Sequence, residues 1–187
     1  AGGVAKASEL IESLRGATNA PVDECLLLRC VGEIGRRVDI SSAGLGAVVD
    51  AFWTSTTADE SVKRSVAFAL GNAIVGASTA MLPVLQRELV SGAHAYFALT
   101  ALKELISHHG AAAGGVAAGA ELPTLDCALY ADVVMPVLLA YCQSDDDGVR
   151  SMVSECLGLM AAAQPQSTLQ EIITHADAAQ VRRCCVA

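Results

Sequence analysis

Apolar residues recur along this sequence with the spacing of one face of an α-helix. Within residues 59–76, offsets 0, 4, 7, 8 and 11 from the first apolar position hold Val62, Val66, Ala69, Leu70 and Ala73. This spacing predicts an amphipathic helix that buries one stripe. Asp59 and Glu60 precede the stripe, where negative charge meets the positive end of the helix dipole.

The same offsets select a stripe in three other segments. From Val149 they select Val149, Val153, Cys156, Leu157 and Met160, after the acidic stretch 145–147. From Asp23 they select Leu27, Cys30, Val31 and Ile34, and from His94 they select Ala98, Ala101, Leu102 and Leu105. A fifth copy is predicted to start at Val181. The recurrence predicts a chain built from repeated helical units.

Glycine recurs at offset 9 in three copies, at Gly32, Gly71 and Gly158. A glycine inside a helix costs about 1 kcal/mol relative to alanine, so its repeated use suggests a packing reason. We expect neighbouring helices to approach closely at these three positions.

The repeat length predicts the fold class. The starts lie about 40 residues apart on average, as in HEAT and armadillo repeats, although two intervals of 32 residues come nearer to shorter helical repeats. The segments 81–85 and 134–138 share a proline early in the preceding helix of a pair, as HEAT repeats do. We therefore predict an all-α fold, an α-solenoid of HEAT-type helical hairpins.

The domain organisation follows from the same alignment. We expect residues 1–187 to form one HEAT-repeat segment with about four repeats and partial repeats at both ends, and to be a fragment of a longer protein. A short first helix is predicted at 7–14, and a helix at 22–38 follows it. An Ala/Gly-rich insert at about 110–126 interrupts the pattern and accounts for its longest interval.

Composition limits where such a chain resides. The sequence is 53% hydrophobic and 4% aromatic, but charge interrupts every apolar stripe before about 18 residues, so we expect no membrane span. No basic flank precedes an apolar segment as in a signal peptide. The seven cysteines include no C-x-x-C, and Cys30 and Cys156 fall on predicted inward stripes. We expect structural thiols in a reducing compartment, and a cytoplasmic and nuclear protein.

Charge suggests a protein partner rather than nucleic acid. The net charge of −8 disfavours binding to phosphates. Nine of the twelve basic residues fall in the second helices of the predicted pairs, which usually line the concave face of a solenoid. As candidate protein-binding residues we select Arg36, Lys63, Arg64, Lys103 and Arg150. Alternatively, such residues solvate the helices or pair with acids of the neighbouring repeat, Glu33 and Glu60 among them.

No catalytic, cofactor or metal site is predicted. His108 and His109 are adjacent, so they would point about 100° apart on a helix and could not share a metal as an i, i+4 pair does. The acidic run 145–147 lacks the spacing of a calcium loop and is better explained as a helix cap. The glycines of the insert lack the order of a phosphate loop. We expect neither an enzyme nor a binder of small-molecule substrates.

The repeat motifs also resemble a known family. The segments CLLLRCVGEIGRRVDISS, SVKRSVAFALGNAIVG, LPVLQRELV, ALKELIS and GVRSMVSECLGLM, in this order, are similar to the C-terminal half of the cullin-associated, neddylation-dissociated proteins. This resemblance implies a non-enzymatic scaffold that binds a cullin and its RING partner and promotes the exchange of substrate receptors on these ubiquitin ligases. No family site residue has a match that can be placed on this sequence.

A second function stays open. Another HEAT adaptor, of the nuclear-transport or phosphatase-scaffold type, would bind a peptide or protein on its concave face. Its marker would be a ladder of tryptophan and asparagine residues along that face. Trp53 and Asn72 alone do not supply one.

Overall fold

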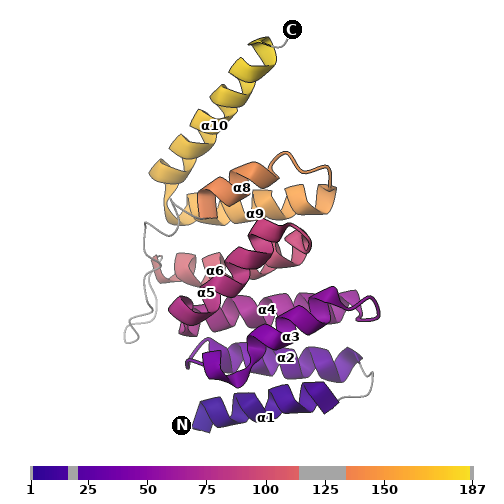
Figure 1. The fold of residues 1–187 in the computed structure, drawn as a ribbon. Helices are drawn as coiled ribbons and strands as arrows, with labels where there is room; N and C mark the ends of the chain where they lie inside the picture. The colour runs from indigo at the N-terminus through magenta and orange to yellow at the C-terminus, as the bar shows by residue number, and fades with distance from the viewer. Residues whose placement is uncertain (1, 17–20, 114–133, 186–187) are drawn as a thin grey trace. The chain divides into compact units, whose positions relative to one another are not determined.

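A computed structural model of the chain describes residues 2–16, 21–113 and 134–185 (Figure 1). The chain divides into two compact units, 1–105 and 106–187, and each is considered by itself. The described residues form α-helices and one 3-10 turn, without a strand. The prediction of an all-α fold is confirmed.

Unit 1 is a stack of helical hairpins. Its elements are α1 (Gly2–Gly16), α2 (Pro21–Gly35), the 3-10 turn η1 (Ser41–Ala43), α3 (Leu45–Thr54), α4 (Glu60–Gly76), α5 (Ser78–Ser91) and the first part of α6 (Ala95–Ala113). Helices α2, α4 and α6 are the second helices of three successive pairs. The turn between α5 and α6 passes through Gly92, whose φ of 70° is a conformation that suits glycine.

The second helices pack against one another in parallel. Gly32 and Gly35 of α2 face Ala69 and Ala73 of α4, so both helices advance in the same direction. Gly71 of α4 in turn faces α6. Helix pairs that stack through such contacts form an α-solenoid, and the predicted HEAT-type class is confirmed.

Unit 2 contains α8 (Met135–Tyr141), α9 (Asp147–Ala163) and α10 (Pro165–Cys185). Asp146 caps α9, as predicted for the acidic run. Helix α10 continues without a turn through Val181, so the prediction that a fifth copy starts there as a new helix is wrong. Residues 176–181 contain neither glycine nor proline, and nothing in them breaks the helix.

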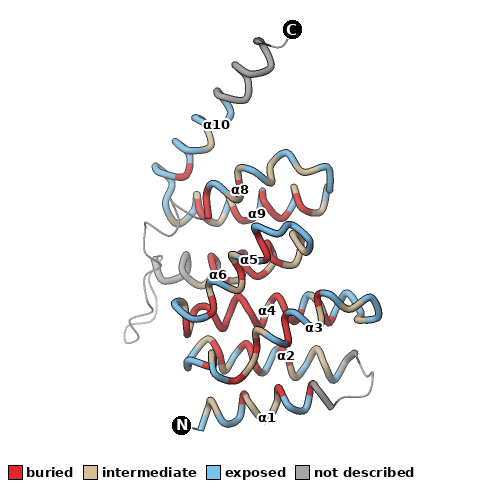
Figure 2. Tube along the Cα trace, viewed as in Figure 1, coloured by how far each residue is buried: buried red, intermediate tan, exposed pale blue. Residues whose placement is uncertain are grey.

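The predicted stripes form part of the core, whose buried residues Figure 2 shows in red, and the other helices supply the rest. In α4 the five stripe residues are 0% exposed, and the four stripe residues of α6 are buried as well. In α9 the predicted stripe is buried except for Leu157, which is half-buried. The helical offsets therefore identify the inward faces of three of the four copies.

The stripe of α2 is displaced by one residue from its predicted position. Leu28, Val31, Gly32 and Gly35 are buried, whereas Cys30 is exposed, so its prediction as an inward residue is wrong. Two buried positions of this stripe are glycines, which add no hydrophobic signal. The apolar pattern therefore predicts the stripe one residue too early. Among the described thiols, Cys25, Cys30, Cys142 and Cys156 are not part of a disulfide.

Several helix ends also differ from prediction. Helix α1 is longer than 7–14, and α2 ends at Gly35 rather than near Val38. Helix α6 extends to Ala113, because the alanines after Gly110 favour helix. Most of the predicted insert, 114–126, lies outside the described residues, as does the turn 17–20. The domain organisation stays a prediction.

Candidate protein-interaction surface

The second helices of unit 1 share one side that carries arginine and aromatic residues. We call it the second-helix face and define it by Arg29, Arg36, Arg64, Phe68 and Tyr96. Arg64 and Phe68 lie four residues apart on α4, so they project from the same side. Arg36 directly follows the last residue of α2 and continues its last turn through the hydrogen bond from its N–H to the carbonyl of Gly32, seven residues after Arg29. Contacts between the helices join these sides.

Two cation–π contacts link successive second helices. The guanidinium carbon of Arg29 lies 5.3 Å from the ring centre of Phe68. That of Arg64 lies 5.8 Å from the ring centre of Tyr96. Each contact joins equivalent positions of adjacent copies, offset 6 in the first case and offset 2 in the second. The repeat thus generates a ladder of two rungs, each within the range of a favourable cation–π interaction.

Ion pairs on the second helices form within one helix. Arg36 contacts Glu33 at 2.6 Å, and Arg64 contacts Glu60 at 2.5 Å. The predicted alternative named these two acids correctly, but it expected pairing between repeats. The hydrogen bond to Glu60 raises the pKa of Arg64 above its ordinary value, and the neighbouring Tyr96 contributes. Such exposed pairs contribute little to stability, although they compensate the charge that a partner would meet.

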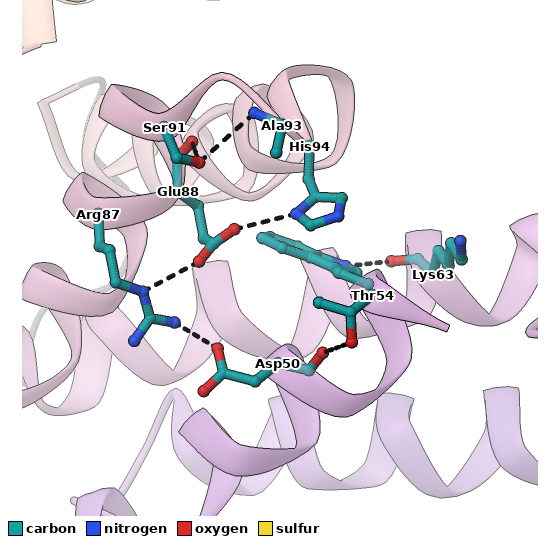
Figure 3. A network of polar contacts seen from close by, with 9 residues as sticks. Asp50, Thr54, Lys63, Arg87, Glu88, Ser91, Ala93 and His94 are labelled. Atoms are coloured by element: carbon teal, nitrogen blue, oxygen red, sulfur yellow. Dashed lines mark hydrogen bonds and ion pairs between the residues drawn. The ribbon is translucent and has the colours of Figure 1, made fainter. Parts of the chain in front are cut away.

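The structure separates the five predicted binding residues. Arg36 and Arg64 lie on the second-helix face. Lys63, next to Arg64, points about 100° away from it, and its backbone carbonyl accepts the indole N–H of Trp53 (Figure 3). Lys103 is half-buried on α6. Arg150 belongs to unit 2, where it pairs with Asp147 of its own helix and donates to the Ser144 carbonyl at 2.5 Å. Their role in binding stays a prediction.

Sequence reasoning missed the aromatic half of the ladder. Phe68 and Tyr96 are half-buried, and Arg29 is a basic residue of a second helix that is not among the five candidates. Comparison of equivalent offsets between adjacent copies would have revealed both rungs, because each joins an arginine to an aromatic residue at the same offset.

A polar network joins the hairpin of α3 and α4 to that of α5 and α6 (Figure 3). Arg87 of α5 pairs with Asp50 of α3 and with Glu88, at 3.0 Å in the second case. Nδ1 of His94 lies 3.1 Å from the other oxygen of Glu88. Burial raises the pKa of Glu88, but the hydrogen bonds with His94 and Arg87 and the charge of Arg87 outweigh it, so the pKa lies below its ordinary value. The 8%-exposed Glu88 is therefore held as a carboxylate between two donors.

Trp53 packs against the buried side of this polar network. Its indole N–H donates to the carbonyl of Lys63 at 3.2 Å. Its ring lies 6.0 Å from His94 and 6.2 Å from Phe97, between ring centres. Trp53 is 2% exposed and connects α3, α4 and the start of α6. It therefore acts as a structural residue between two hairpins.

Asn72 is also internal. It is 0% exposed, and its Nδ2 donates to the carbonyl of Phe68 at 3.0 Å. Its Oδ1 has no hydrogen-bond partner among the described residues, and neither has the buried Nε of Arg36. Because Trp53 and Asn72 are both buried, neither offers the exposed ladder of a peptide-binding HEAT adaptor.

The described residues hold no cluster of three or more His, Cys, Asp or Glu side chains that could bind a metal ion. Among the same residues, no helix is long and apolar enough to cross a membrane.

Comparison with known proteins supports this description. No family model matches the chain. The chain is 30% identical over 169 residues to the cullin-associated NEDD8-dissociated protein 1 of Drosophila melanogaster, covering 89% of the chain and 12% of that protein. The protein of the same name from Arabidopsis thaliana is 29% identical over 186 residues, covering 95% and 14%. That from Dictyostelium discoideum is 27% identical over 150 residues, covering 79% and 11%.

The resemblance inferred from the repeat motifs is thereby confirmed. It extends over most of the chain rather than over one repeat. The chain spans about an eighth of the length of these relatives, 11% to 14%.

Proposed function

We propose that this chain is a segment of a non-enzymatic scaffold that binds cullin–RING ubiquitin ligase cores and regulates their assembly and the exchange of their substrate receptors. The observation that carries the proposal is similarity over 79% to 95% of the chain to proteins named for association with cullins and dissociation from NEDD8. Stacked helical hairpins with exposed charged and half-buried aromatic side chains suit such a role, since they provide extended surfaces for a partner. We also propose that the protein acts in the cytoplasm and nucleus.

The proposed regulation follows from binding alone. A scaffold that occupies the same surface of a core as a substrate-receptor module changes the population of each complex through the difference between their affinities. Modification of the core by the ubiquitin-like protein would then oppose binding, by placing a bulky group on the shared surface. No reaction by the scaffold is required.

The decisive experiment measures binding of the natural full-length protein that carries this segment. Affinity for a cullin–RING core is compared between the unmodified and the NEDD8-modified core by biolayer interferometry. We expect binding to the unmodified core and its loss on modification. Equal affinity for both cores, or for neither, would refute the proposal. The full-length protein is needed because contacts spread along a solenoid add their contributions through effective concentration.

This proposal takes four of the five predicted residues as candidate contacts: Arg36, Lys63, Lys103 and Arg150. Arg64 is left out because both Glu60 and Tyr96 already engage its guanidinium. Lys63 offers the clearest test of a candidate contact, because its ammonium group forms no ion pair among the described residues. Reversal of its charge should slow association, since exposed charges steer the encounter of two proteins. Another HEAT-adaptor function gains no support from the buried Trp53 and Asn72.

A further inference from the structure

The two rungs of the ladder differ in the balance of their charge. Arg64 is stacked on Tyr96 and compensated by Glu60 at 2.5 Å. Arg29 is exposed and stacked on Phe68, yet among the described residues it forms no ion pair. Arg29 thus presents an uncompensated guanidinium on the second-helix face.

Stacking prepares this guanidinium for a ligand. The guanidinium carbon of Arg29 lies 5.3 Å from the centre of the Phe68 ring, within the range of a cation–π contact, and the planar group carries five N–H donors that can bind a ligand. A long side chain normally loses conformational entropy when it binds, and an arginine already held against a ring loses less. Arginine is also among the residues that most often dominate the energy of protein interfaces.

The surroundings favour a negatively charged ligand. Arg36 lies seven residues after Arg29, directly past the end of α2, and the exposed Arg37 follows it. The intervening Glu33 is already engaged by Arg36 at 2.6 Å. A carboxylate can accept two parallel hydrogen bonds from one guanidinium, which gives such a contact geometric specificity.

We propose that Arg29, held on Phe68, anchors a carboxylate from an acidic segment of the protein partner. The proposal rests on the proposed function, because the partner is then the cullin–RING core. The proposal adds Arg29 to the predicted contacts. Arg64, on the equivalent rung, has a structural role instead. The carboxylate of the partner would occupy the open edge of the Arg29 guanidinium beside α2.

The test compares the two rungs in the full-length protein. Equilibrium affinity for the unmodified cullin–RING core is measured for the wild type, Arg29→Ala and the matched control Arg64→Ala. We expect Arg29→Ala to weaken binding about tenfold and Arg64→Ala less than about threefold, in keeping with the dominance of a few residues in an interface. Arg29→Lys keeps the charge but lacks the planar fork, so it should still weaken binding.

The outcomes separate the two proposals. If the wild type binds and Arg29→Ala binds equally well, the role of Arg29 is wrong and the proposed function stands. If Arg64→Ala weakens binding as much as Arg29→Ala, the rungs act only through stacking and the role of Arg29 is again wrong. If the wild type fails to bind, the proposed function is refuted and the anchor with it. Circular dichroism establishes that each variant is folded, and the affinity of Arg29→Lys decides between these outcomes if Arg29→Ala does not fold.

Discussion

Gly71 of α4 lies directly against the backbone carbonyl of Ala101 in α6. A Cβ atom at position 71 would overlap that oxygen and would lie 2.7 Å from Cβ of Glu104. Gly158, at the same offset of its copy, is exposed, and no atom lies within 4 Å of the position its Cβ would occupy. The close approach expected at three glycines is therefore confirmed at Gly71 and at Gly32, whose Cβ would lie 3.0 Å from Cα of Ala69, and it is wrong at Gly158.

The contrast predicts opposite effects of one substitution. Gly71→Ala should destabilise unit 1 by about 1–3 kcal/mol, because a backbone carbonyl cannot move aside as a flexible side chain does. Gly158→Ala should stabilise unit 2 by up to about 1 kcal/mol, through helix propensity alone. Urea unfolding tests both, with the fluorescence of Trp53, the only tryptophan in the sequence, reporting on unit 1 and circular dichroism on the whole chain. A neutral Gly71→Ala would show that α4 and α6 can separate at no cost.

Substitutions at Trp53 should lower the free energy of unfolding by amounts that depend on the size of the new side chain. Trp53→Ala should cost about 3–5 kcal/mol, because it leaves a cavity where the ring meets His94 and Phe97. Trp53→Phe retains a ring and loses the hydrogen bond to the Lys63 carbonyl, so a smaller cost is expected. Urea unfolding followed by circular dichroism measures both. Equal costs for the two variants would assign the stabilisation to the hydrogen bond rather than to packing.

The sequence predicts the helices well and the contacts between repeats poorly. Val62 and Ala73 could be assigned to the core because helical spacing reports which side of one helix is apolar. Cys30 could not be placed, because the buried neighbours Gly32 and Gly35 carry no hydrophobic signal. The contact of Arg29 with another helix depends on how two repeats are aligned in space, which the pattern of one helix does not encode.

Glu88 predicts an acid-sensitive contribution to the stability of unit 1. Its pKa is lowered in the folded state from an ordinary value of 4.5, so the folded protein binds its proton less readily than the unfolded chain. The contribution is therefore complete above 4.5 and is lost as the pH falls through the folded-state pKa. Glu88→Gln should lower stability near pH 7, and the difference from the wild type should shrink as the pH falls below 4.5.

Urea midpoints measured across this pH range test the Glu88 prediction. Some acid sensitivity should remain in Glu88→Gln, because hydrogen bonds from Ser41 and Ser61 lower the pKa values of Asp39 and Asp59 as well. Parallel midpoint curves for the two proteins would show that the carboxylate of Glu88 gains nothing from His94 and Arg87.

The acidic run before α9 predicts that one aspartate matters more than its neighbour. Oδ1 of Asp146 accepts hydrogen bonds from the backbone N–H groups of Gly148, at 2.7 Å, and Val149, at 3.2 Å. Asp146→Ala should destabilise unit 2 by about 1 kcal/mol, since it leaves two N–H groups at the start of the helix without this acceptor. Asp146→Asn retains a capping oxygen and should stay close to the wild type.

Asp145→Ala, a change at an exposed residue without a capping bond, is the matched control and should have little effect. Thermal unfolding followed by circular dichroism compares the three variants, and equal losses for Asp145→Ala and Asp146→Ala would assign the effect to negative charge near the helix dipole instead of the cap.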